Sequence, residues 1–424
     1  MKQVSVTLST YTADVSGVCS ALYELGGMVV IHDPSGCNST YNTHDEPRWY
    51  DMDSLIFISG LSQMDAIMGN DDKFINDIVR AAKELKPRFI ALVRTPIPLM
   101  TGTDFEGIAR VIEKQTQIPV FYFPTSGMHS YVSGAGMALE TVARELVLPT
   151  NANEHFKENG IKIENVSNEL SVADTKKQNQ QKLNQSEQKQ IENTESKQSN
   201  SKIKINILGA TPLDFSVNST LDSIKEFLSK HFEIISTFAM GSSIEDIQKA
   251  GVNLVISSVG FPAAKVLEER FSTPYVIGTP VKGFAGIIAE KLIDAAWTGK
   301  SQTAYFSVTS SGKNISRAAN GIYIIGESVI SQSLKAAMAL KQGIDATVIC
   351  PLETEPEYIG ENVLLFSSEE EIKAAIAEAK TVIADPIYKT FCADETNFIA
   401  LPHEAFSGRI YRKEIPNLME WVTI

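Results

Sequence analysis

The sequence predicts an α/β fold with three Rossmann-like lobes, in which mostly parallel, doubly wound sheets surround a central cleft. Short apolar runs alternate with amphipathic segments along the chain, which is typical of parallel sheets whose strands are joined by helices. A polar stretch interrupts this alternation after residue 174, and the pattern restarts near residue 203 and again near residue 321. The length of 424 residues also exceeds that of a domain with a single hydrophobic core.

The first lobe is predicted to span residues 1–150. Its helix at 73–85 carries apolar residues at i, i+3 and i+4 spacing and ends before Pro87. The apolar run at 89–93 is continuous, as in a strand covered on both faces. With these belong a helix at 105–115 and strands at 29–32, 55–58 and 120–123.

Residues 151–202 are predicted to be a linker, because Gln, Asn, Lys, Ser and Glu dominate most of this stretch. Such a composition buries too little apolar surface to offset the entropy of ordering, so we expect disorder. The second lobe, 203–312, has expected strands at 203–208, 232–236, 254–257 and 275–278 and helices at 219–230, 244–250 and 263–270. The third lobe, 313–424, has expected strands at 321–326, 346–350, 381–384 and 399–402 and helices at 328–342 and 369–379.

Composition excludes several classes of function. The net charge of −13 and the lack of a Lys/Arg stripe argue against nucleic-acid binding. No apolar run approaches the ~20 residues of a membrane span, and the first residues contain no signal-peptide core, so we expect no membrane association and a cytoplasmic protein. The four cysteines are scattered and form neither a disulfide framework nor a CxxC motif. Any metal cluster must therefore take ligands from another chain or from non-cysteine groups.

Cys37 has the surroundings that most favour ligation. The predicted strand at 29–32 runs into a Pro34-Ser35-Gly36-Cys37 turn, which places a thiol at the carboxyl edge of a sheet, where ligands of α/β proteins bind. The alternative is a small buried hydrophobic residue, the commonest role of a free cysteine.

Three segments in order resemble the nitrogenase component 1 family, and especially the subunits of dark-operative protochlorophyllide reductase and of the nickel-tetrapyrrole reductive cyclase. They are the opening from Thr7 to Cys37, the stretch from Asp65 to the Lys86-Pro87 pair, and the turn from Arg94 to Asp104. The similarity continues through residues 275–280 and 384–386 and covers essentially the whole chain apart from the linker.

The chain also departs from that family. Family members with a full set of cluster ligands have a cysteine shortly before the position of Gly17, and this sequence has none there. The third family cysteine is replaced here by Thr95. Cys19 lies within the helix and is expected to be a packed small residue. The resemblance thus implies that Cys37, with Gly36 and Thr95 beside it, contributes one ligand to an iron–sulfur cluster of the [4Fe-4S] type that a second subunit shares.

That second subunit is either a cysteine-richer homologous component 1 subunit or a second copy of this chain. We expect the interface around Cys37 and the helix at 17–22. The resemblance also implies that an ATP-dependent iron protein supplies the electrons. Because this sequence has no Walker A motif, the ATP step must belong to that other polypeptide.

The function that the resemblance implies is that of an oxidoreductase subunit acting on a small molecule or a tetrapyrrole-like substrate. It is not expected to be a dinitrogen reductase, since no cysteine lies between Cys37 and Cys350 to anchor a large cofactor. One alternative is a non-catalytic scaffold on which a metallocluster or cofactor is assembled. Another is a small-molecule binder without a cluster.

Further candidates surround these features. Asp33 could shuttle a proton, or it could simply begin a turn with Pro34. His44 is a candidate proton donor in a polar loop, and His403 falls where nitrogenase places its cofactor histidine. The sequence does not decide the roles of Cys350 and Cys392.

Overall fold

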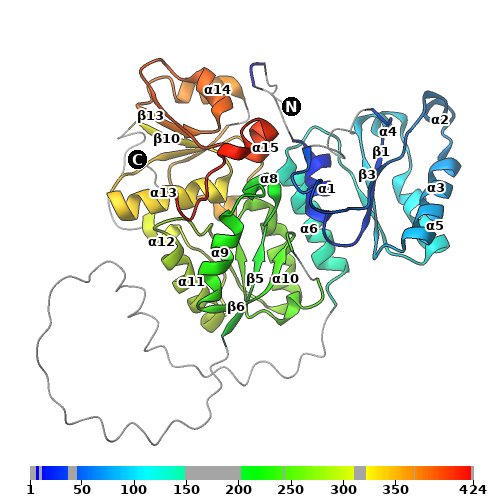
Figure 1. Ribbon diagram of the computed structural model, residues 1–424, viewed down its shortest axis with the longest axis horizontal. Helices are drawn as coiled ribbons and strands as arrows, with labels where there is room; N and C mark the ends of the chain where they lie inside the picture. Colours follow the sequence, from blue (N-terminus) through cyan, green and yellow to red (C-terminus); the bar gives the residue numbers. More distant parts are fainter. Residues whose placement is uncertain are drawn as a thin grey trace, which may run out of the picture.

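The computed structural model describes residues 6–8, 12–36, 45–148, 202–241, 244–309, 321–366 and 368–421. The named strands of these residues form three sheets in which all pairings are parallel, which confirms the predicted α/β class (Figure 1). We call the units built on these sheets lobe 1, lobe 2 and lobe 3, in chain order. Residues 151–201 of the predicted linker lie outside the described residues, and the exact lobe boundaries remain predictions.

Lobe 1 has the strand order β2-β1-β3-β4. Its strands are β1 (Met28–His32), β2 (Ile56–Ile58), β3 (Ile90–Arg94) and β4 (Val120–Phe123). Its helices are α1 (Asp14–Leu22), α2 (Gln63–Met68), α3 (Asp71–Leu85), α4 (Pro96–Thr101), α5 (Phe105–Thr116) and α6 (Tyr131–Glu145). β1 is buried at every residue, as expected of a strand covered on both faces.

Lobe 2 has the order β6-β5-β7-β8-β9. Its strands are β5 (Ile203–Leu208), β6 (Phe232–Phe238), β7 (Val252–Val255), β8 (Tyr275–Ile277) and β9 (Gln302–Thr303). Its helices are α8 (Pro212–Phe215), α9 (Thr220–Ser229), α10 (Phe261–Phe271), α11 (Ala285–Thr298) and α12 (Phe306–Thr309). The helix predicted at 244–250 is wrong, since this segment forms only the 3₁₀ turn Ile247–Lys249. Gly251 and the start of β7 follow at once and leave no room for further turns.

Lobe 3 has the order β12-β11-β10-β13-β14. Its strands are β10 (Ile322–Ile325), β11 (Thr347–Cys350), β12 (Val363–Leu365), β13 (Thr381–Ala384) and β14 (Asn397–Ala400). Its helices are α13 (Ser328–Gln342), α14 (Glu369–Ala375) and the short α15 (Glu404–Ser407).

Each sheet contains a point where the strand order reverses. In lobe 1 it lies between β1 and β3, in lobe 2 between β5 and β7, and in lobe 3 between β10 and β13. The carboxyl ends of the two strands at such a point are where open α/β sheets bind ligands. These three edges are therefore the positions in the fold where functional side chains are expected.

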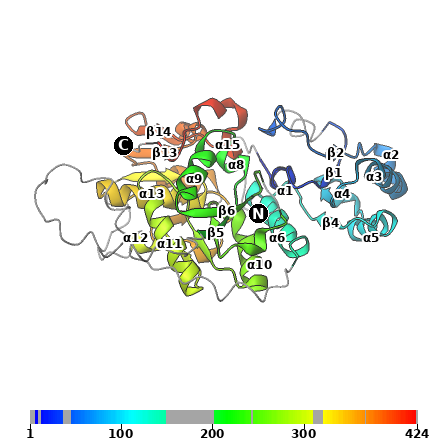
Figure 2. The ribbon, with the colours of Figure 1, turned by 60° about the horizontal axis from the view of Figure 1, so that its bottom comes forward.

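Helix α6 joins lobe 1 to lobe 2, packing on α1 on one side and on α10 on the other (Figure 2). The helices α1 and α6 cross in backbone contact, because a Cβ at Gly17 would lie 2.2 Å from the Tyr131 carbonyl oxygen and one at Gly134 would lie 1.9 Å from that of Asp14. Nearly all of α1 is buried in this contact. The subunit interface that we expected around residues 17–22 is therefore wrong for this helix, which packs inside its own chain.

One continuous apolar core spans all three lobes. A continuous cluster of buried residues runs from α1 and α6 through the lobe 2 sheet to α13 and Leu418, and smaller clusters lie on the outer sides of lobes 1 and 3. Among the described residues, no helix is both long and apolar enough to cross a membrane.

Candidate functional site

At the reversal point of lobe 1, Asp33 and Thr95 are in direct contact. Asp33 follows β1 and Thr95 follows β3, and the Thr95 hydroxyl lies 2.8 Å from Asp33 Oδ1 and 2.9 Å from the His32 carbonyl oxygen. Both side chains are buried, whereas Gly36 is exposed. The Asp33 N–H donates to Ser59 Oγ at 3.1 Å, and Leu61 donates its N–H to the Asp33 carbonyl at 2.9 Å. The turn that leads to Cys37 therefore begins at Asp33, which these hydrogen bonds hold in place.

At the reversal point of lobe 3, two buried acids follow the strands. Glu327, after β10, accepts hydrogen bonds from the Ser258 N–H at 3.0 Å and its hydroxyl at 2.5 Å, which joins lobe 3 to lobe 2. Asp385, after β13, accepts from the His403 N–H and the Ser407 hydroxyl, both at 2.7 Å. Burial raises the pKa of Glu327 and of Asp385, and the hydrogen bonds that each carboxylate accepts partly oppose this shift.

Three side chains, one from each lobe, meet between these edges. Tyr131 of lobe 1 donates its hydroxyl to Asp214 Oδ1 of lobe 2 at 2.5 Å. His403 of lobe 3 places Nε2 3.4 Å from the same oxygen. His403 Nδ1 accepts the Ala405 N–H at 3.3 Å, so the proton of the neutral ring lies on Nε2, facing Asp214. Nε2 is buried and makes no hydrogen bond within the described part of the chain.

Comparison with known proteins agrees with this architecture. A family model described as nitrogenase component 1 type oxidoreductase matches residues 16–289, about two thirds of the chain. The chain belongs to this family. Two solved structures titled as nitrogenase Cp1, one at pH 5 and one at pH 6.5, are similar in fold, each with a TM-score of 0.51 and 14% identity. They cover 88% and 94% of this chain, which corresponds to 72% and 70% of their own chains. A search of curated proteins gave no match.

The residues predicted from this family resemblance fall in two places. Asp33, Thr95 and Gly36 lie together at the lobe 1 edge, while His403 lies at the junction with Asp214 and Tyr131. Cys37 and His44 lie outside the described residues, so their predicted roles remain predictions. The Thr95 hydroxyl donates a hydrogen bond to Asp33. Its role as a direct cofactor contact is likewise still a prediction.

The described part of this family member does not by itself supply a cluster site. No group of three or more His, Cys, Asp or Glu side chains within it is arranged to hold a metal ion. Cys19 is fully buried in α1, and burial raises its thiol pKa, as expected of a packed residue. Burial raises the pKa of Cys350 to about 12, and it also raises that of the half-buried Cys392. These three cysteines are therefore not arranged as ligands of a cluster.

The junction places a buried ring nitrogen beside a carboxylate. A buried donor without a partner costs about 1–3 kcal/mol, so a polar group that bonded His403 Nε2 would relieve this cost. Asp214 Oδ1 lies 3.4 Å from Nε2, and the other oxygen of Asp214 accepts from the Thr211 hydroxyl at 3.2 Å. Burial and the neighbouring Asp214 charge raise the pKa of Tyr131 well above its ordinary value, so that Tyr131 remains a donor.

The sequence analysis did not identify Asp214, Tyr131 or Glu327, and it included Asp385 only within the segment 384–386 that resembles the family. One pattern could have found three of the four. Asp214, Glu327 and Asp385 all follow the carboxyl end of a strand that lies at a reversal point of its sheet. Tyr131 begins a helix that the sequence analysis did not predict, and it does not directly follow a strand, so it carried no such signal.

Proposed function

We propose that the chain is a subunit of a nitrogenase component 1-like enzyme in the cytoplasm. It receives electrons from an ATP-dependent iron protein through an iron–sulfur cluster and passes them to a small molecule or a tetrapyrrole-like substrate. Family membership supports the general oxidoreductase role. The remainder is our proposal.

One observation supports the proposed position of the cluster. The Asp33–Thr95 contact lies at the reversal point of lobe 1 and holds the corner from which the turn to Cys37 leaves. A [4Fe-4S] cluster takes four ligands, and this turn offers a single thiol. We therefore propose that a partner subunit, either a homologous chain or a second copy, supplies the other ligands.

An exposed apolar surface near this turn supports a partner. Met64, Ile67 and Met68 of α2 are 67%, 80% and 71% exposed, and Leu99 and Met100 of α4 are exposed beside them. Both helices lie at the carboxyl edge of the lobe 1 sheet, the edge that also carries Asp33 and Gly36. Exposed apolar side chains gathered in this way are typical of a protein interface. We call these five residues the α2/α4 surface.

The junction supports a reductive role because reduction of an organic substrate consumes protons as well as electrons. His403 and Asp214 form a buried pair that could deliver them, and Tyr131 orients the Asp214 carboxylate. His403 is thus proposed as the proton donor of this chain. Asp33, beside the cluster turn, and His44, outside the described residues, remain proposed donors.

Anaerobic purification with any partner tests the proposal. The wild-type protein should contain iron and sulfide, and Cys37→Ala should lose most of both. Cys392→Ala is the matched control, because this half-buried thiol lies in lobe 3 and should not affect the iron content. Full iron in Cys37→Ala would refute the cluster position. Repeated substrate reduction with ATP and an iron protein distinguishes the enzyme from the alternative, an assembly scaffold, which would release its cluster to an acceptor without turnover.

A further inference from the structure

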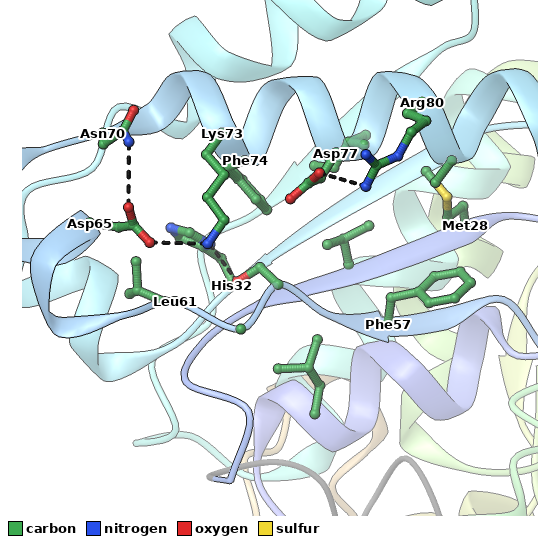
Figure 3. Close-up of a pocket in the computed structure, with 16 residues that line it drawn as sticks. Met28, His32, Phe57, Leu61, Asp65, Asn70, Lys73, Phe74, Asp77 and Arg80 are labelled. Atoms are coloured by element: carbon green, nitrogen blue, oxygen red, sulfur yellow. Dashed lines mark hydrogen bonds and ion pairs between the residues drawn. The ribbon is translucent and has the colours of Figure 1, made fainter.

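Lobe 1 contains a cavity that the proposed function does not use. It lies between helix α3 and the sheet face formed by β1 and β2, with the start of α2 at one end (Figure 3). Its volume is about 260 Å³. Apolar side chains make up much of the lining: Met28, Val30, Phe57, Ile58, Phe74 and Ile78.

The size of the cavity sets the size of a ligand. A dry apolar cavity of about 150 Å³ accommodates benzene, so by proportion a volume of 260 Å³ accommodates about ten non-hydrogen atoms. Phe57 is 39% exposed and points to the face of β2 opposite to that of its buried neighbour Ile56. The cavity therefore offers apolar surface that an apolar ligand body would cover.

The walls are held in place before any ligand binds. The His32 ring stacks on Phe74 with centroids 3.9 Å apart, and its Nδ1 pairs with Ser59 Oγ at 2.8 Å. The loop from Ser59 to Leu61 is in turn bonded to Asp33. A preformed apolar cleft with a few polar groups at one end is the usual form of a small-molecule site.

Figure 3 shows Asp65, Asn70 and Lys73 close to His32 at one end of the cavity. The Asp65 carboxylate is already occupied, since it accepts from the Ser62 hydroxyl at 2.6 Å, from Lys73 Nζ at 3.3 Å and from the Asn70 amide at 3.4 Å. Within the described residues Lys73 donates to Asp65 alone, so two of its three ammonium donors are unused, and its side chain is 53% exposed. At this end Lys73 can therefore still donate to a ligand, with its charge partly balanced by Asp65.

The other end of the cavity carries Asp77 and Arg80, near Met28 and Phe57 in Figure 3. Arg80 donates to Asp77 at 2.8 Å, and both side chains are largely in solvent. Such an exposed pair contributes little to binding. The Lys73–Asp65 pair is less exposed, with 53% and 17% of its side chains accessible against 73% and 46% for Arg80 and Asp77. Lys73 also lies beside the buried, neutral His32, so it is the cation that a ligand within the cavity would contact.

We propose that this cavity binds a small monocarboxylic acid, with a compact apolar body between α3 and β1/β2 and its carboxylate at Lys73. The whole ligand would contain about ten non-hydrogen atoms. This site lies on the α3 side of the lobe 1 sheet and is independent of the cluster and of the junction at His403.

Phenylacetate, with ten non-hydrogen atoms, is a suitable probe. Calorimetry and protein-observed NMR on the full chain should show saturable binding that is at least tenfold tighter than that of the uncharged phenylacetamide. Lys73→Gln should remove this preference for the acid. Lys83→Gln is the matched control on the same helix, since Lys83 is exposed and does not line the cavity, and it should bind as the wild type does.

Filling the cavity gives an independent test. Ala81 lies on α3 and lines the cavity, so Ala81→Phe should abolish phenylacetate binding while the thermal unfolding transition is retained. The proposal is overturned if phenylacetate does not bind, if the amide binds as tightly as the acid, or if folded Ala81→Phe binds like the wild type. None of these results bears on the iron content, which tests the proposed function separately.

Discussion

His403 Nε2 faces Asp214 Oδ1 across the boundary between lobes 3 and 2 at 3.4 Å, and Tyr131 of lobe 1 donates to that same oxygen at 2.5 Å. One carboxylate oxygen is thus the meeting point of the three lobes. Because these lobes share a continuous apolar core, the geometry of this meeting point is fixed by the packing of the whole chain.

The first prediction concerns His403 as a proton donor. We expect His403→Gln to lower kcat by about 10²-fold or more, the usual contribution of a positioned general acid, with KM and iron content unchanged. His129→Gln is the control, because His129 is 59% exposed and pairs with Glu353 on the surface. Steady-state kinetics with reductant and iron protein measure both variants. Equal turnover of His403→Gln and wild type would remove His403 from the mechanism.

The second prediction concerns the crossing of α1 and α6. Gly134→Ala places a methyl group where the Asp14 carbonyl oxygen would be only 1.9 Å away, so the two backbones must separate. We expect a loss of about 2–3 kcal/mol or more in the free energy of unfolding.

Gly286 in α11 is the matched control for this change. Nothing lies within 4 Å of a Cβ at Gly286, so Gly286→Ala should be neutral or slightly stabilising, by at most about 0.5–1 kcal/mol, since Gly286 lies in the first turn of α11. Denaturant unfolding measures both. A neutral Gly134→Ala would mean that the helices are not in backbone contact.

The strands could be predicted because their apolar runs are local. The runs at 120–123, 203–208 and 381–384 coincide with β4, β5 and β13 residue for residue. Helix α6 was not predicted, although its apolar residues at 131, 135, 138, 139 and 142 have helical spacing. Gly134 and Gly136 weaken the local helix signal. Gly134 is needed because the helix touches the backbone of α1, a segment far away in the sequence, and no local pattern reports that contact.

Part of the candidate site could likewise be predicted from local sequence, and part could not. Asp33 and Thr95 could be identified because each directly follows a strand, and the structure brings them into contact. The junction could not be identified from the sequence, because Asp214, Tyr131 and His403 are separated by 83 to 272 positions and meet only through the packing of the lobes. His403 was found through the family resemblance alone.

The third prediction is a dependence of stability on pH at His32. Burial lowers the pKa of His32 to about 4, with a smaller opposing effect of the Asp65 charge, whereas an unfolded histidine titrates near 6.5. Between these two pH values the unfolded chain binds more protons than the folded chain, so the free energy of unfolding falls as the pH falls from 6.5 to 4. This group contributes a loss of about 2–3 kcal/mol by pH 4.5.

His32→Gln removes this contribution while the other titrating groups remain. Denaturant unfolding at pH 7 and at pH 4.5 should therefore give a smaller difference between the two pH values for the variant than for the wild type. The same difference in both proteins would show that His32 does not titrate with a lowered pKa.

The fourth prediction concerns the α2/α4 surface and the proposed partner. Ile67 is 80% exposed on α2, near the turn to Cys37, and we expect it to be buried when the partner binds. Ile67→Asp would then place a charge in an apolar interface and weaken association at least tenfold. Ile410→Asp is the matched control, because Ile410 is 74% exposed on lobe 3, away from that surface.

Native mass measurement of the anaerobically purified holoprotein follows this association directly. The wild type and Ile410→Asp should retain the mass of an oligomer, and Ile67→Asp should shift towards the single chain and lose iron with it, because the partner supplies most of the cluster ligands. Loss of iron together with the partner is the decisive result, since a merely adhesive surface would leave the iron content unchanged. A wild-type monomer with a full cluster would rule out shared ligands, and an oligomeric Ile67→Asp would place the interface elsewhere on the chain.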